Sequence, residues 1–229
     1  MAKAKQEKRT HSSGVTNYLI GYNGIQTVGW SYLLYLIILY YIYPTSVSLY
    51  ETVKWTVIIF QNAAVLEVVH AQMGIVPSNP AVTAFQVASR VMVVCGVLMA
   101  TQAARDTIGL PLALIAWSIT EVIRYGNYTL SLMNCVPYIV KWLRYTTFYP
   151  LYPIGVTGEL LCIFAASQEV GDNQMWSFKL PNQINMIFNY QYFLWFTMFL
   201  YIPLFPQMYM HMINQRKKVL GRVTSKKEN

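Results

Sequence analysis

Long apolar runs with few charges dominate this chain of 229 residues and limit the folds open to it. Hydrophobic residues make up 55% of the sequence, and charged residues only 11%. A bilayer core is about 30 Å thick, so a helix of about 20 apolar residues can cross it. Runs of this length occur six times, at about 16–42, 55–73, 81–104, 109–132, 145–168 and 188–212. The sequence therefore predicts an all-α integral membrane protein, a bundle of six transmembrane helices.

Basic residues are distributed unevenly around these runs, and this distribution predicts the orientation of the bundle. Twelve of the seventeen lysine and arginine residues lie in the two tails or in the connection near 133–144, against three on the opposite side. Short segments rich in lysine and arginine stay in the cytoplasm. We therefore expect a basic cytosolic N-terminal tail at 1–15, a six-span membrane domain at 16–212 that carries the functional site, and a basic cytosolic C-terminal tail at 213–229. The three residues on the opposite side are Lys54, Arg105 and Lys179.

The net charge of +8 comes mainly from the tails. Basic tails beside membrane spans are explained by topology and by anionic lipid headgroups, so we expect a lipid bilayer and no nucleic acid as the partner of these charges. The last four residues, Lys226 to Asn229, resemble the di-lysine retrieval signal of endoplasmic-reticulum membrane proteins. That signal acts on a cytosolic C-terminus, which the charge distribution predicts independently. The expected location is the membrane of the endoplasmic reticulum.

The cysteines give no sign of a disulfide framework or a metal site. Cys95, Cys135 and Cys162 are odd in number, far apart, and in or beside apolar runs. We predict that all three are buried packing residues.

Six glutamate, arginine and histidine side chains fall inside the first five apolar runs. Such residues are rare in membrane spans and usually face the interior of a bundle. Compared by depth, none lies clearly in the lumenal half, so the simplest arrangement is one polar cavity that opens toward the cytosol. The six residues are Glu67, His70, Arg90, Glu121, Arg124 and Glu159, and His70, on a mostly apolar face, fits a hydrogen-bonded packing role.

Ion pairing between helices is the first interpretation for four of these side chains. Glu121 and Arg124 are three residues apart and can pair on one helix, while Arg90 can pair with Glu67 or Glu121. Three glutamates face two arginines, so one carboxylate is left without an arginine. Glu159 is the best candidate, because its own helix offers no nearby cation, and an unpaired carboxylate is available as a base.

A glutamate follows a tyrosine by seven residues in the fifth run, Tyr152 and Glu159, with Gly155 and Gly158 between them. Seven residues is close to two helical turns, so both side chains project from one face, about 10 Å apart along the axis. The glycines leave room for another helix or a ligand. A proline follows the tyrosine, which biases Tyr152 away from helical geometry and toward a kinked helix start. One phenol and one carboxylate facing the same cavity can serve as general acid and general base.

Several motifs, in order and in different runs, resemble the membrane-bound very-long-chain 3-hydroxyacyl-CoA dehydratases, once called protein-tyrosine-phosphatase-like proteins. One is the frame of the tyrosine-phosphatase signature at 70–78, where Ala71 replaces the nucleophilic cysteine and Pro77 replaces the phosphate-binding arginine. Without a thiolate or a guanidinium the phosphatase mechanism cannot run. The resemblance covers roughly residues 15–220. The other motifs are Leu66–His70, Ser89–Val91, Trp117–Tyr125, Leu151–Glu159 and Gln215–Lys218.

The resemblance implies the third step of fatty-acid elongation, in which a 3-hydroxyacyl-CoA becomes a trans-2-enoyl-CoA and water. It implies no metal or redox cofactor, and it implies the condensing enzyme, the ketoacyl-CoA reductase and the enoyl-CoA reductase as partners. The family's catalytic pair, in the motif Tyr-Pro-x-Gly-x-x-x-Glu, corresponds to Tyr152 and Glu159. We expect Glu159 to take the C2 proton and Tyr152 to protonate the leaving hydroxyl, and the reverse assignment stays open.

Three basic residues are candidates for substrate binding. Arg124, if it is not fully paired, or a backbone amide near the prolines is expected to meet the thioester oxygen. Lys141 and Arg144 precede the fifth run on the cytosolic side and are expected to bind the phosphates of CoA.

Two other functions are compatible with the sequence. One is a catalytically silent scaffold of the elongation complex, and the other is a transporter that couples proton movement to Glu159. The intact Tyr152 and Glu159 argue against the scaffold, and the lack of an internal repeat argues against the transporter.

Overall fold

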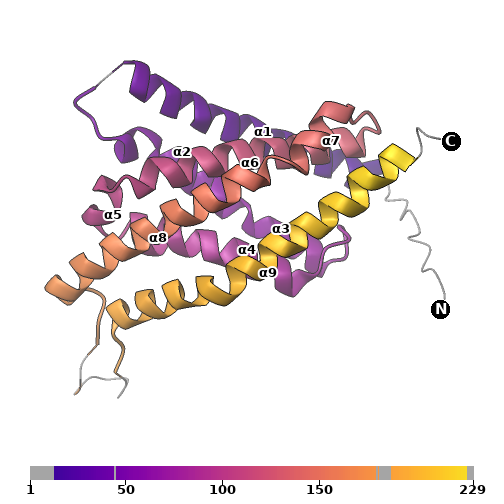
Figure 1. Ribbon diagram of the computed structural model, residues 1–229. Helices are drawn as coiled ribbons and strands as arrows, with labels where there is room; N and C mark the ends of the chain where they lie inside the picture. Colours follow the sequence, from indigo (N-terminus) through magenta and orange to yellow (C-terminus); the bar gives the residue numbers. More distant parts are fainter. Residues whose placement is uncertain (1–12, 44, 179, 181–186, 226–229) are drawn as a thin grey trace.

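The computed structural model describes residues 13–43, 45–178, 180 and 187–225, the last five by their backbone alone. Its helices lie side by side along a common long axis (Figure 1). Among the described residues, the one β-type pairing is an isolated bridge between Phe178 and Phe188. The N-terminal basic residues, Lys179 and the di-lysine sequence at 226–229, used above to predict orientation and location, lie outside the described residues.

Local sequence signals explain where several helices begin. The Ser48 side chain accepts a hydrogen bond from the Glu51 amide at 3.3 Å, and the Asn79 side chain accepts one from the Ala81 amide at 3.0 Å. Both residues are favoured N-caps, because their side-chain oxygens satisfy amides that have no partner within the helix. The elements in chain order are α1 Ser13–Ile42, α2 Leu49–Ala63, α3 Val65–Gln72, α4 Pro80–Val91, the π-helix η1 Met92–Leu98, α5 Gln102–Asp106, α6 Gly109–Leu132, α7 Tyr138–Arg144, α8 Phe148–Asn173 and α9 Tyr190–Ser225.

Five stretches of the described chain are long and apolar enough to cross a membrane: α1, α2 with α3, α4 with η1, α8, and α9 as far as Leu220. An all-helical, multi-pass membrane protein is therefore supported, and five of the six predicted runs correspond to these stretches. The remaining run forms α6 with the predicted bounds but is not among the five. Its Glu121 and Arg124 lower its apolar character.

Two predicted helix ends are wrong. The third run ends at Leu98 rather than near 104, because the Arg105 guanidinium donates to the carbonyls of Leu98 and Met99, each at 2.6 Å. Basic side chains commonly satisfy the last carbonyls of a helix in this way. The last helix continues to Ser225, well beyond the predicted end at 212.

Helix α6 packs most extensively against α1 and α8, and α8 packs in turn against α9. The contact between α6 and α8 depends on glycine. A Cβ atom at Gly158 would lie 2.5 Å from the backbone nitrogen of Ala113, and one at Gly109 would lie 2.6 Å from the carbonyl oxygen of Gly158. The predicted room beside Gly158 is thus filled by another helix, which brings the α6 backbone next to Glu159.

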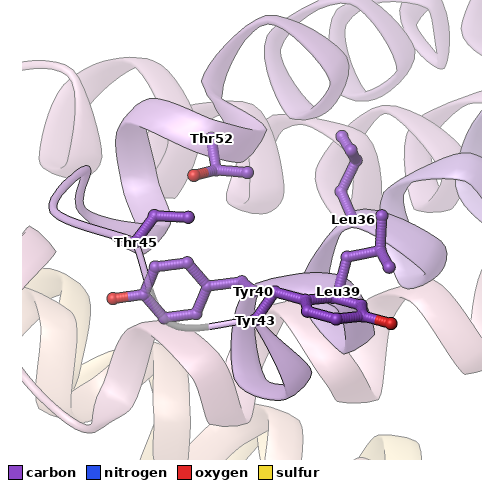
Figure 2. Close-up of a pocket in the computed structure, with 6 residues that line it drawn as sticks. All are labelled: Leu36, Leu39, Tyr40, Tyr43, Thr45 and Thr52. Carbon is purple, nitrogen blue, oxygen red and sulfur yellow. The ribbon is translucent and has the colours of Figure 1, made fainter.

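The two ends of the bundle differ. The start of α1, the short helix α7 and the end of α9 lie at one end, and α5 lies at the other with the connection between α1 and α2 (Figure 1). A pocket of about 220 Å³ lies at this second end, and it is lined by uncharged side chains (Figure 2). These are Leu36, Leu39, Tyr40, Tyr43, Thr45 and Thr52, so the pocket is not where the charged residues of the bundle gather.

The cysteine prediction is correct in part. Cys162 is fully buried, and Cys95 is half-buried, with its sulfur 3.5 Å from Nδ2 of Asn62. Cys135 is exposed, so the prediction is wrong for this residue. It lies in the connection between α6 and α7, outside the helices that form the core.

Candidate active site

Glu159 lies on α8 where three helices meet, and it is 8% exposed. Its Oε1 accepts a hydrogen bond from Nε1 of Trp117 on α6 at 2.7 Å. Its Oε2 accepts one from the hydroxyl of Tyr201 on α9 at 2.6 Å. No ion pair among the described residues includes Glu159, as the count of three glutamates against two arginines predicts.

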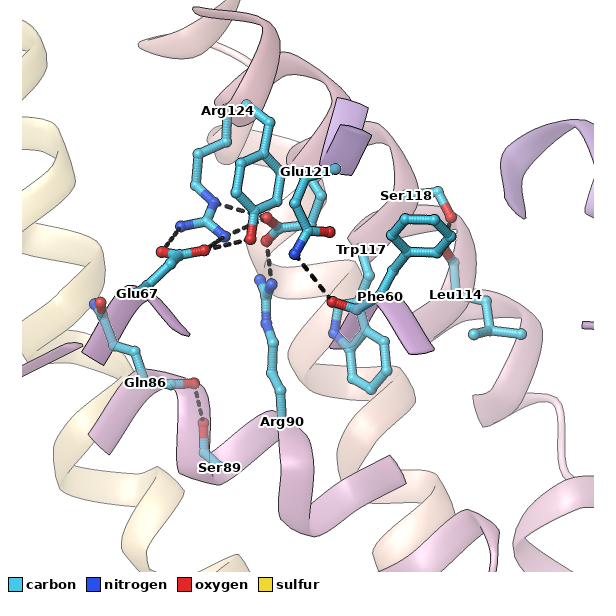
Figure 3. A network of polar contacts seen from close by, with 12 residues as sticks. Phe60, Glu67, Gln86, Ser89, Arg90, Leu114, Trp117, Ser118, Glu121 and Arg124 are labelled. Atoms are coloured by element: carbon cyan, nitrogen blue, oxygen red, sulfur yellow. Dashed lines mark hydrogen bonds and ion pairs between the residues drawn. The ribbon is translucent and has the colours of Figure 1, made fainter. Parts of the chain in front are cut away.

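Four other charged side chains inside the bundle, one buried and three half-buried, form a network of ion pairs (Figure 3). The Arg124 guanidinium donates to both oxygens of Glu67, at 2.7 and 2.8 Å, and through Nε to Glu121 at 2.6 Å. Arg90 donates to the second oxygen of Glu121, and the Tyr125 hydroxyl donates to Glu67. The predicted pairing of these two glutamates with these two arginines is confirmed.

Trp117 contacts both this network and Glu159. The Arg90 guanidinium lies 5.8 Å from the ring centre of Trp117, and the N–H of the same ring bonds Glu159. Polar groups of α3, α4, α6, α8 and α9 therefore gather in one region of the bundle, as predicted. Arg124 donates to two carboxylates and is therefore fully paired. We expected it to meet the thioester oxygen only if it was not fully paired, so the structure does not support that role.

Tyr152 is α-helical and lies within the first turns of α8, so the prediction that it departs from helical geometry is wrong. The helix begins at Phe148, and the amide of Leu151 donates to the Thr147 carbonyl at 3.1 Å. The Tyr152 ring stacks on Phe205 and Tyr209 of α9, with ring centres 5.1 and 6.1 Å away. Pro153 has no amide hydrogen, so it removes one hydrogen bond of the helix, the one to the Tyr149 carbonyl, close to the helix start.

A stripe of three aromatic side chains on α9 covers the face of α8 that carries Tyr152 and Glu159. Tyr201, Phe205 and Tyr209 are spaced by four residues, so they share one helix face. Tyr201 contacts Glu159, while the other two contact Tyr152. The interface between α8 and α9 is therefore where a substrate would have to meet both side chains.

The remaining candidates lie nearer the end that holds α7. Lys141 and Arg144 are on α7, and Nη2 of Arg144 lies 3.4 Å from the Tyr128 hydroxyl, to which it donates.

His70 is buried, and its Nε2 lies 2.9 Å from the Tyr18 hydroxyl, so it is hydrogen-bonded as predicted.

Trp117 and Tyr201 were not identified as site residues from the sequence. Tyr201 is 42 residues from Glu159, and the last run contains so many aromatic residues that none stands out. Trp117 is 42 residues away on the other side, in the family motif Trp117–Tyr125, of which only the charged residues were considered for the site. Among the described residues, no three His, Cys, Asp or Glu side chains gather closely enough to hold a metal ion.

Comparisons with known proteins agree on one family. The model of the family "Protein tyrosine phosphatase-like protein, PTPLA" matches residues 61–222. A very-long-chain (3R)-3-hydroxyacyl-CoA dehydratase of Caenorhabditis elegans is 46% identical over 216 residues, which cover 93% of this chain and 99% of that protein. Dehydratase 2 of Mus musculus is 44% identical over 97% of this chain and 88% of its own. The dehydratase PASTICCINO 2 of Arabidopsis thaliana is 34% identical over 92% and 95%. No solved structure matches.

Proposed function

This chain belongs to the protein tyrosine phosphatase-like family, and we propose that it removes water from very-long-chain (3R)-3-hydroxyacyl-CoA to give trans-2-enoyl-CoA, the third step of fatty-acid elongation. The relatives named above are dehydratases acting on such substrates. The observation that carries the proposal is the arrangement of Glu159, a buried carboxylate held by two neutral donors two turns from Tyr152 on one helix.

The reaction needs a base for the C2 proton and an acid for the departing hydroxyl. Glu159 takes the C2 proton, and the electron pair of the C2–H bond forms the C2=C3 double bond. The C3–O bond breaks, and the hydroxyl leaves as water with the Tyr152 proton. One proton then returns from the glutamic acid to the phenolate, which completes the cycle.

The hydrogen bonds at Glu159 support this assignment over the reverse. An indole N–H can only donate, so Oε1 of Glu159 is the acceptor toward Trp117, and Oε2 accepts from the Tyr201 hydroxyl. Each oxygen keeps further acceptor capacity toward the substrate. Tyr152 makes no hydrogen bond with the described part of the chain, so its hydroxyl proton is not committed to a neighbour.

The proposed topology has six spans, with α6 as the fourth. Its 24 residues would extend about 36 Å at 1.5 Å per residue, enough to cross a bilayer core. Both tails are cytosolic in this proposal, in the membrane of the endoplasmic reticulum. The CoA moiety then binds from the cytosol at Lys141 and Arg144, the acyl chain extends toward the opposite end, and the other elongation-cycle enzymes are the partners.

The test uses purified full-length protein in detergent and a long-chain (3R)-3-hydroxyacyl-CoA, with the enoyl-CoA product followed by mass spectrometry. Tyr152→Phe and Glu159→Gln each remove one reacting group. Tyr192→Phe and Glu169→Gln are matched controls, because Tyr192 is 64% exposed and Glu169, outside the polar region around Glu159, accepts a hydrogen bond from the Ala103 amide.

Turnover by the wild type and both controls, with neither site variant active, would support the function and the catalytic pair. If no protein turns over although acyl-CoA still binds, the chain is a catalytically silent scaffold of the elongation complex. Turnover by all five proteins would retain the function and refute the assignment of Tyr152 and Glu159.

A further inference from the structure

The hydrogen bond from Tyr201 to Glu159 reaches the site from α9, outside the seven-residue motif on α8. We propose that Tyr201 is a positioning residue that fixes the Glu159 carboxylate in the orientation from which it takes the C2 proton. The inference rests on the proposed dehydratase function and adds to it a residue that the motif does not contain.

The Glu159 carboxylate accepts one hydrogen bond at each of its two oxygens. The Tyr201 hydroxyl lies 2.6 Å from Oε2 and Nε1 of Trp117 lies 2.7 Å from Oε1, both within the range of charge-assisted hydrogen bonds. A glutamate side chain rotates about three bonds, and a donor on one oxygen leaves its carboxylate free to turn. Donors on both oxygens, from two different helices, fix the plane of the carboxylate as well as its position.

These two hydrogen bonds also matter because no ion pair in the described part of the chain includes Glu159. Glu121 lies between two guanidinium groups, whereas both partners of Glu159 are neutral. A cation would hold the carboxylate by neutralising its charge, which would weaken it as a base. Two neutral donors orient the carboxylate and leave it the negative end of the site, as a proton acceptor requires.

A purely structural role, in which Tyr201 only joins α9 to α8, makes a different prediction. Helix α9 is also held by the stacking of Phe205 and Tyr209 on Tyr152, and by the Tyr190 hydroxyl, which donates to the Gly96 carbonyl at 2.7 Å. Loss of one hydroxyl therefore leaves α9 in place. Tyr201→Phe keeps the ring and removes only the donor, so it separates orientation of the base from packing.

The experiment compares wild type, Tyr201→Phe, Tyr201→His and Tyr192→Phe as purified full-length proteins. The substrate is a long-chain (3R)-3-hydroxyacyl-CoA with either hydrogen or deuterium at C2. Rates are expressed per folded molecule, with the folded fraction taken from thermal unfolding and gel filtration. Tyr192 is on the same helix but exposed, so its hydroxyl is the matched control.

We expect Tyr201→Phe to lower kcat by about 10- to 100-fold, the value of a hydrogen bond to a charged group, with KM little changed. The deuterium isotope effect on kcat should be at least as large as in the wild type, because proton removal is the impaired step. Tyr201→His, which keeps an N–H donor, should recover part of the rate, and Tyr192→Phe should match the wild type.

A kcat within twofold of the wild type in folded Tyr201→Phe would overturn the inference. A loss fully explained by a smaller folded fraction, or one accompanied by a smaller isotope effect, would also overturn it and leave Tyr201 a packing residue. An inactive wild type is a different result, because it would refute the proposed dehydratase function itself.

Discussion

Replacing Gly158 by alanine should damage both the fold and the site, because this glycine is where α6 and α8 come closest to Glu159. The added Cβ would lie 2.5 Å from the backbone nitrogen of Ala113, and 2.7 Å from the carbonyl oxygen of Gly109. Both neighbours are backbone atoms and cannot rotate away. The two helices must therefore move apart.

The size of that movement follows from the distances. Ordinary contact begins at 3.4 Å, so the helices are short of it by about 0.9 Å at the closest atom. Overpacking of this kind costs about 1–3 kcal/mol of stability. The Trp117 hydrogen bond to Glu159, 2.7 Å long, spans the same interface and would be stretched beyond the usual limit of about 3.2 Å. A misplaced catalytic group at about this scale costs roughly 100-fold in rate.

The assay is thermal unfolding together with enoyl-CoA formation, on Gly158→Ala and on Gly126→Ala as a control. A Cβ at Gly126, on α6, would meet Thr27 at 3.9 Å, which is ordinary contact, so this variant should match the wild type or gain slightly from the better helix former. Wild-type stability and rate in Gly158→Ala would refute the close packing of α6 on α8 and, with it, the placement of Glu159.

Side chains of α7, of the charged network and of the connection between α6 and α7 give three further predictions. Alanine at both Lys141 and Arg144 should raise KM for acyl-CoA more than it lowers kcat, and an unchanged KM would remove them from the CoA site. Arg124→Gln leaves Glu67 without a cation and Glu121 with Arg90 alone, and it should cost about 3–5 kcal/mol in chemical unfolding. Lys54→Ala, which breaks a surface pair, should cost at most about 1 kcal/mol, and equal losses would contradict the structure. A membrane-impermeant maleimide should label the exposed Cys135 in intact microsomes, and labelling only after permeabilisation would reverse the proposed topology.

The helical content and most helix positions could be predicted from sequence, because a membrane span is defined by a local property, the length of its apolar run. The run at 109–132 coincides with α6. The errors occur where a long-range or side-chain contact decides. The end of η1 depends on Arg105 reaching back to Leu98, and the exposure of Cys135 depends on where the chain leaves the bundle.

The site could be predicted in outline for a similar reason. Charges in apolar runs are few enough to count, and the count identified Glu159 as the carboxylate without an arginine. Its actual partners could not be found in this way, because Trp117 and Tyr201 approach from other helices, each 42 residues away, and neither is charged. A neutral hydrogen-bond donor does not change the count of charges, so this count cannot identify it.

The contrast between Glu121 and Glu159 connects the two parts of this polar region. Both are buried, at 1% and 8% exposure, so burial alone does not distinguish them. Glu121 forms ion pairs with two guanidinium groups, those of Arg90 and Arg124. Among the described residues, Glu159 accepts from an indole N–H and a phenol O–H and forms no ion pair. The two arginines pair with Glu67 and Glu121 instead. The network therefore holds both arginines in ion pairs with other carboxylates, and Glu159, the base of the proposed reaction, is held by two neutral donors.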